Sequence, residues 1–158
     1  MGASSGSHGA GYCQSVPVIT LALAARMTAA AIEQAAEVGA LVSAAVVDAG
    51  GHLMHFQRMD GAEIAGPTLA VDKAFTAVAH RVETGKLTSL AVPGGELAGL
   101  AANGGGRYVV FGGGLPCWYG DRVVAGIGVS GGSVEQDVRC ARAAMALWES
   151  SSNAPVAD

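Results

Sequence analysis

Residues 109–132 read VVFGGGLPCWYGDRVVAGIGVSGG, with a short apolar run on each side of the dipeptide Gly120-Asp121. Two apolar runs joined by two turn residues predict a β-hairpin. Glycines precede the hairpin at 112–114 and follow it at 131–132. Glycine is favoured where the backbone adopts a positive φ or approaches a neighbour closely. We therefore expect a hairpin between two glycine hinges, with the run LPCWY in its first strand.

The rest of the chain predicts helices that flank a sheet. Helical patterns cover 20–38, 66 to about 81 and 133 to about 150, and strand-like segments cover 41–48, 52–59 and 107–111. Ser133 and Gln136 have the spacing of a capping box at the start of the last helix. Together with the hairpin, these segments predict an α+β fold with about five strands in a mainly antiparallel sheet, flanked by helices.

Size and composition indicate one domain that associates with copies of itself. The chain has 158 residues, of which 51% are hydrophobic and 14% are charged, whereas the usual charged share is about 25%. Such a composition favours a homo-oligomer, because subunit interfaces cover excess apolar area. We expect a flexible arm over 1–18, one folded domain over 19–150 and a disordered tail over 151–158.

Charge, hydropathy and cysteine content exclude several classes of protein. The formal net charge is −4 and there is no basic cluster, so nucleic-acid binding is not expected. No apolar run is long enough for a membrane span, and the first residues lack the features of a signal peptide. The cysteines are odd in number and lack zinc-binding spacing, which favours a reducing compartment. We expect a cytoplasmic protein without membrane association and without a metal-ion site.

Charged residues are rare, so those near predicted strand ends are candidates for a site. Arg58, Lys73 and Arg107 would form a cationic pocket for a small anionic or carbonyl metabolite. Such a pocket would suit an isomerase, lyase or cyclase that needs no cofactor, with Lys73 and Arg58 holding the anion. The candidates for proton transfer are Asp60, His55 and Asp137. The alternative for Arg58 and Asp60 is an ordinary surface ion pair.

The helix expected over 66–81 has a polar stripe made of Lys73, Thr76 and His80. Such a stripe is typical of a solvated surface. Alternatively, it would face a ligand or a neighbouring subunit, as expected of a non-catalytic sensor or assembly module.

Four sequence segments resemble the GlcG/HbpS-like family of small haem-binding proteins. They are VVDAGGHLMHFQRMDGA (46–62), DKAFTA (72–77), GGLP (113–116) and DRVVAGIGVSGGSVEQD (121–137). The resemblance covers about residues 20–149, and a related domain occurs fused to corrinoid adenosyltransferases. It implies a profilin-like or PAS-like α+β fold, a homo-oligomer, and haem binding or an accessory role in haem degradation for some members.

Haem is therefore the expected cofactor, and four residues are candidates for its axial ligand. They are His52, His55, Cys117 and Tyr119. No CxxCH motif is present, so haem would be bound non-covalently. The family commonly has an aliphatic residue after GGLP, whereas this chain has Cys117, followed by Trp118 and Tyr119.

We expect a haem-binding or haem-processing protein, with the cofactor-independent enzyme and the sensor module as alternatives. The expected ligand-binding residues are Arg58, Thr76, Arg107, Gly114, Pro116, Cys117, Trp118, Tyr119 and Asp137, and the expected catalytic residues are Lys73, Asp60 and His55.

Overall fold

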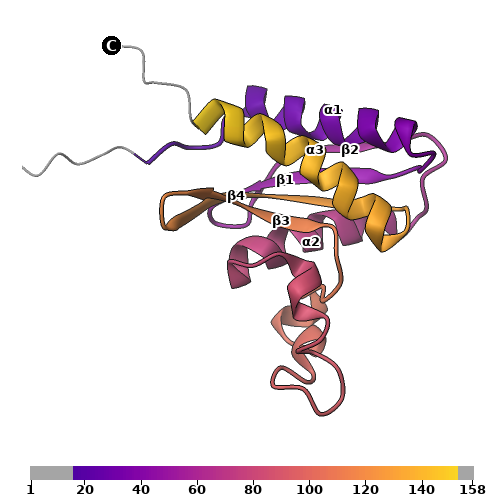
Figure 1. Cartoon of the computed structure of the whole chain (residues 1–158), viewed down its shortest axis with the longest axis vertical. Helices are drawn as coiled ribbons and strands as arrows, with labels where there is room; N and C mark the ends of the chain where they lie inside the picture. The colour runs from indigo at the N-terminus through magenta and orange to yellow at the C-terminus, as the bar shows by residue number, and fades with distance from the viewer. Residues whose placement is uncertain (1–15, 153–158) are drawn as a thin grey trace, which may run out of the picture.

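The computed structural model describes residues 16–152, which form an α+β domain (Figure 1). The α-helices are α1 (Leu21–Glu37), α2 (Gly66–His80) and α3 (Val134–Ser152), and the strands are β1 (Ser43–Asp48), β2 (Leu53–Arg58), β3 (Gly114–Tyr119) and β4 (Arg122–Ser130). Between α2 and β3 lie the short 3-10 helices η1 (Thr84–Leu87), η2 (Leu100–Ala102) and η3 (Gly104–Gly106). The predicted α-helices are confirmed, as is the hairpin, whose turn contains Gly120 with a φ of 59°.

The sheet is antiparallel throughout, in the order β2-β1-β4-β3. Within residues 16–152 it has four strands, so the expectation of about five is wrong: residues 107–111 are irregular. A side chain of α2 takes the place of a partner strand for this segment. Thr76 Oγ1 accepts a hydrogen bond from Val109 N over 2.9 Å and lies 3.2 Å from the carbonyl oxygen of Arg107.

Helices α1 and α3 pack side by side on one face of the sheet, and α2 covers the other face (Figure 1). The main core lies between the sheet and the α1/α3 pair and contains small and branched apolar side chains, with Met27 and Trp148 among the largest. A smaller cluster of Val47, Ala74 and Val78 lies under α2. Because helices cover both faces of the sheet, successive side chains of β1 are buried in opposite layers.

Two glycines of β4 let the backbone of α2 approach the sheet closely. A Cβ atom on Gly128 would lie 2.6 Å from Ala74 N and would overlap the carbonyl oxygen of Ala70. A Cβ atom on Gly126 would lie 2.7 Å from Ala74 O. Because real Cβ atoms do not approach other atoms so closely, the glycines in AGIGVS are a requirement of the contact between helix and sheet.

Capping side chains define the ends of the outer helices. Thr20 Oγ1 accepts from Leu23 N over 3.2 Å at the start of α1. The predicted capping box is confirmed, since Ser133 Oγ accepts from Gln136 N over 3.2 Å and Gln136 Oε1 accepts from Ser133 N over 2.9 Å. Helix α3 continues to Ser152, into the expected tail. The rest of that tail, from residue 153, and residues 1–15 of the expected N-terminal arm lie outside the described residues.

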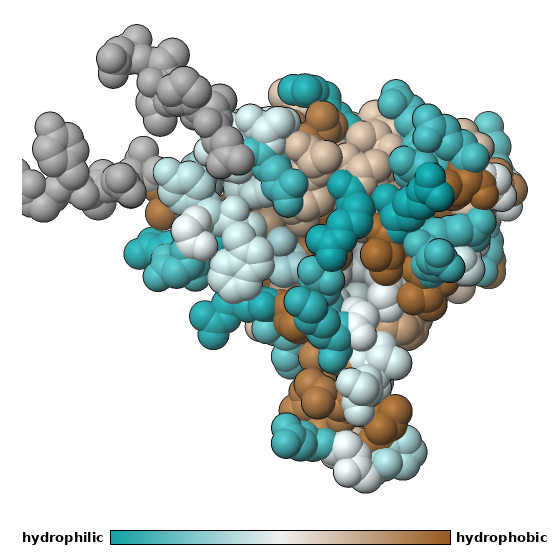
Figure 2. Space-filling model, in the orientation of Figure 1, coloured by the Kyte–Doolittle hydropathy of each residue, from teal (hydrophilic) through white to brown (hydrophobic). Residues whose placement is uncertain are grey.

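Between η1 and β3, residues 88–113 form a projection that extends away from the sheet (Figure 1). We call this segment the projecting loop. It exposes apolar side chains, with Leu90 38%, Val92 45% and Leu97 36% exposed. Figure 2 shows hydrophobic side chains on this part of the surface.

Candidate functional site

Lys73 and Asp137 form an ion pair inside the protein. The buried Lys73 Nζ donates to Asp137 Oδ2 over 2.8 Å and to the carbonyl oxygen of Val129 over 2.9 Å. The same nitrogen lies 5.0 Å from the centre of the Phe111 ring. Asp137 Oδ1 accepts from Gly132 N over 2.9 Å. All polar atoms of the pair have partners, so it ties α2 to the end of β4 and the start of α3.

Burial shifts the pKa values of both members of this pair. Desolvation lowers the pKa of Lys73, and the hydrogen bond and charge of Asp137 oppose that shift. Desolvation raises the pKa of Asp137, opposed by the hydrogen bond and charge of Lys73. Lys73 and Thr76 are both 0% exposed. The polar stripe of α2 is therefore neither a solvated surface nor a face presented to a partner, because these two members point into the protein.

Arg107 is held against the outer side of α2. Its Cζ lies 3.8 Å from the centre of the Phe75 ring, and its Nε pairs with Asp72 Oδ1 over 2.9 Å. Thr76, also on α2, fixes the backbone on either side of Tyr108 through Val109 N and Arg107 O. Arg107 and Thr76 thus anchor the returning end of the projecting loop.

The expected cationic pocket is not assembled in the structure. Arg58, at the end of β2, donates from Nη2 to the carbonyl oxygen of Ala62, Lys73 is paired with Asp137, and Arg107 has its own partner. Asp60 lies exposed in the turn after β2. Within residues 16–152 it forms no ion pair with Arg58, so the alternative of a surface ion pair is also not observed.

His55 lies on the side of β2 that faces α1, where it contacts a buried threonine. Its Nδ1 lies 2.8 Å from Thr28 Oγ1. The Thr28 hydroxyl donates to the carbonyl oxygen of Ala25 over 3.0 Å and accepts from Gln57 Nε2 over 3.1 Å. Since the hydroxyl has one hydrogen, a Thr28 that donates to Ala25 requires His55 to donate from Nδ1. In that tautomer, His55 Nε2 carries the free lone pair.

The other two described histidines have different surroundings. His52 is exposed after the β1–β2 turn and lines an apolar pocket of about 270 Å³ together with Pro17, Val18 and Val124. His80, at the end of α2, lies edge-on to Tyr108 with ring centres 4.5 Å apart, and its Nε2 is buried without a hydrogen-bond partner among the described residues. The Nε2 atom of His80 is thus buried, whereas the side chain of His52 is exposed.

The run LPCWY divides between the core and the surface. Cys117 is 0% exposed, and burial, with a smaller effect from the Glu149 charge, raises its pKa to about 12. Such a thiol is inert and inaccessible, which argues against Cys117 as an axial ligand. Tyr119 is partly buried against the core, and Gly114 N donates to Thr84 Oγ1 over 3.0 Å. Trp118, by contrast, is 42% exposed.

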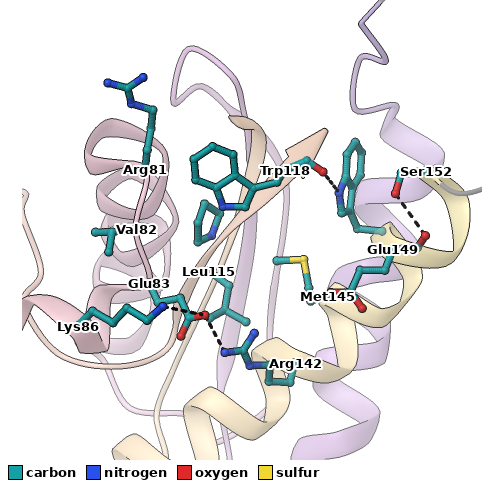
Figure 3. Close-up of a pocket in the computed structure, with 12 residues that line it drawn as sticks. Arg81, Val82, Glu83, Lys86, Leu115, Trp118, Arg142, Met145, Glu149 and Ser152 are labelled. Atoms are coloured by element: carbon teal, nitrogen blue, oxygen red, sulfur yellow. Dashed lines mark hydrogen bonds and ion pairs between the residues drawn. The ribbon is translucent and has the colours of Figure 1, made fainter. Parts of the chain in front are cut away.

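A cleft of about 380 Å³ lies along the outer edge of β3, between the end of α2 and helix α3 (Figure 3). Leu115, Pro116 and Trp118 of β3 line it from the sheet side, and Met145 and Trp148 line it from α3. We call it the β3 cleft. It is the place where the structure brings together Pro116 and Trp118, two of the residues expected to bind a ligand.

Charged side chains of both signs line the β3 cleft, namely Arg81, Lys86 and Arg142 with Glu83 and Glu149. Glu83 Oε1 pairs with Arg142 Nη2 over 2.8 Å and with Lys86 Nζ over 3.9 Å. Arg81 has no ion pair and no side-chain hydrogen bond among residues 16–152. Figure 3 shows Arg81 and Trp118 toward one end of the cleft and the Glu83 cluster at the other.

Sequence reasoning missed Arg81, Glu83 and Arg142. The ion pair between Glu83 and Arg142 joins residues 59 positions apart, which no local pattern reveals. The sequence contained one clue to Arg81, because this residue directly follows a predicted helix, where glycine is the usual residue.

The described residues contain neither a cluster of metal-binding side chains nor a membrane-spanning helix. No group of three or more histidine, cysteine, aspartate or glutamate side chains in the described part of the chain could hold a metal ion. None of the helices described is long and apolar enough to cross a membrane.

The sheet order and the placement of the helices define the class: a small α+β domain with two helices on one sheet face and one on the other. The family follows from the sequence match. A family model described as haem degrading protein HbpS-like matches residues 19–146, so the chain belongs to the HbpS-like family.

Relatives include proteins of different length. The chain is 40% identical over 132 residues to an uncharacterized 15.0 kDa protein from Citrobacter freundii, encoded in the dhaT-dhaS intergenic region, and the match covers 84% of this chain and 93% of that protein. It is 41% identical over 121 residues to the corrinoid adenosyltransferase PduO of Citrobacter freundii. That match covers 77% of this chain but only 36% of PduO.

One solved structure of a relative contains a ligand. The crystal structure of a PduOC:heme complex superposes with a TM-score of 0.80 and 37% sequence identity, covering 83% of this chain and 95% of that chain.

Proposed function

We propose that this protein binds haem non-covalently. The observation that carries the proposal is membership of the HbpS-like family together with the haem complex of a relative that matches 83% of this chain. The earlier alternatives, a cofactor-independent enzyme and a sensor module, have no comparable support.

His55 fits the role of an axial ligand. His55 is half-buried, and its Nδ1 contacts Thr28 Oγ1. Histidines that bind a metal commonly donate their other ring N–H to a fixed oxygen, which sets the tautomer and the orientation of the ring. Ala25, three residues before Thr28, and Ala29, which follows it, are also half-buried. Small apolar side chains of this kind let a flat ring system approach the imidazole.

Haem bound here would supply a redox-active iron. His55 would bind through Nε2, Thr28 would hold the ring through Nδ1, and Gln57 would fix the Thr28 hydroxyl through its amide. His52 and His80 lack such an anchored ring nitrogen among their described contacts, so they serve as internal controls.

Titration of the purified full chain with hemin tests the proposal. We expect a saturable Soret shift at one hemin per chain. His55→Ala should change the position of the Soret band, whereas His52→Ala and His80→Ala should keep it. Thr28→Val should retain the fold and weaken hemin binding by roughly ten- to a hundredfold.

The outcomes separate the two parts of the proposal. A titration without a saturable Soret shift would overturn haem binding. An unchanged spectrum in the His55→Ala protein would overturn the choice of ligand while leaving haem binding in place.

We also propose that the protein is a homo-oligomer. The support is the low charged share of 14% and the exposed apolar side chains of the projecting loop. An apolar surface of this kind is typical of an interface between subunits.

A further inference from the structure

We propose that the β3 cleft binds a small aromatic carboxylate. This site is separate from the haem proposal, because the cleft contains neither His55 nor Thr28. Its volume of about 380 Å³ lies within the range of about 300–1,000 Å³ that small-molecule sites have.

The outer edge of β3 excludes one class of occupant, a peptide that would add a further strand. Gly114 N is already bonded to Thr84 Oγ1. Pro116 has no N–H to offer. The carbonyl oxygen of Trp118 accepts from Trp148 Nε1 over 3.0 Å. With these positions taken, the edge has too few free groups for strand addition, so the cleft suits a small molecule.

Arg81 provides a free cation beside the cleft. Within residues 16–152, its side chain has no ion pair, whereas Arg142 and Lys86 share Glu83. A guanidinium without a carboxylate partner is a donor well matched to a carboxylate ligand.

The backbone of Arg81 supports a role beyond ending the helix. Its φ is 52° and its ψ is 44°, and it is the only described residue other than glycine with a positive φ. Glycine is usual at this position after a helix, because a residue with a Cβ atom is strained in the left-handed conformation. Strain retained at such a position is a sign of function when a side chain is placed by it. Here the strained residue places a guanidinium at the rim of the cleft.

An exposed aromatic side chain, Trp118, lines the cleft on the same side as Arg81 (Figure 3). Trp118 is 42% exposed, although large aromatic side chains are usually covered. Pro116 and Met145, both largely buried, form an apolar wall beside it. A flat ring stacks favourably on an indole, and methionine contacts ring edges well. A ligand with an aromatic ring and a carboxylate would stack on Trp118 and pair with Arg81.

Isothermal titration calorimetry with 2-naphthoate, and with the neutral 2-naphthamide as its matched control, tests the proposal on the full chain. We expect saturable binding of naphthoate and at least about tenfold weaker binding of the amide, because a charge-assisted hydrogen bond is lost. Arg81→Gly should also weaken naphthoate binding at least about tenfold. This variant relieves the strained backbone, so it should fold at least as well as the parent protein.

Two further variants identify the contacts. Trp118→Ala should weaken naphthoate and naphthamide alike, because both use the ring. Arg122→Ala removes one exposed positive charge outside the cleft and should leave naphthoate binding unchanged. Equal affinities for acid and amide, unchanged binding by Arg81→Gly, an equal loss in Arg122→Ala, or no binding at all would each overturn the proposal.

Discussion

The position of Lys73 illustrates how burial changes the role of a charged residue. A lysine on an exposed helix face could hold an anionic substrate, but Lys73 is 0% exposed and its Nζ is bonded to Asp137 and Val129. Removing one partner from a buried ion pair is costly, because the other charge stays buried without compensation. We therefore assign the pair a structural role.

Lys73→Met is expected to lower the free energy of unfolding by about 3–5 kcal/mol at neutral pH. Without Lys73, only the backbone hydrogen bonds from Gly131 and Gly132 oppose the desolvation that already raises the pKa of Asp137. An acid with a raised pKa in the folded state loses stability as pH rises, from its unfolded pKa of about 3.9 through its folded pKa. The loss in stability should therefore be smaller at pH 5 than at pH 8, measured by urea denaturation.

The double variant Lys73→Met/Asp137→Asn is the control for that prediction. It removes the unpaired charge, so it should recover part of the stability and most of the pH dependence. A loss that is the same at pH 5 and pH 8, or that the double variant does not reduce, would contradict this account.

The sequence allowed Lys73, Asp137 and Trp118 to be chosen as notable residues, but not their roles. Lys73 and Asp137 are 64 positions apart and meet only because α2 and α3 reach the same end of β4. Arg81, Glu83 and Arg142 were missed for the same reason. Single residues can be selected by type and local pattern, whereas their partners depend on how the elements are packed.

At the scale of elements, the contact between α2 and β4 depends on the absence of side chains. Gly128→Ala is expected to lower the free energy of unfolding by about 3 kcal/mol, because the added methyl would overlap the backbone of α2. Gly85→Ala is the matched control, since a Cβ there would lie 3.4 Å from its nearest neighbour, an ordinary contact. Chemical denaturation of both variants tests this, and similar losses would refute the role of close approach.

Elements with local signals could be predicted from sequence. The capping residues Ser133 and Gln136 marked the start of α3, and the turn at Gly120 marked the β3–β4 hairpin. The strand predicted at 107–111 is not formed. The side chain of Thr76, rather than a neighbouring strand, forms hydrogen bonds with the backbone of this segment. Apolar character alone does not distinguish a strand paired in a sheet from an irregular segment whose backbone is bonded by a side chain.

At the scale of the whole molecule, the projecting loop is the place to test self-association. Replacing Leu90 and Val92 by glutamate should shift the protein from oligomer toward monomer in light scattering, because charges would be buried at the interface. Ile64→Glu is the control, since Ile64 is 91% exposed and lies outside the loop. A monomeric parent protein, or variants with unchanged mass, would contradict an interface through this loop.

The hydrogen bond from Trp148 to Trp118 has a consequence for synthesis of the chain on the ribosome. Strand β3 precedes α3 in the chain, so β3 leaves the ribosome before the indole that covers its outer edge. During that interval, the carbonyl oxygen of Trp118 is free to pair with strands of other nascent chains. Translation that stalls within α3 should therefore yield fragments that aggregate. Completion of α3 prevents this, because its indole then occupies the carbonyl oxygen at the strand edge.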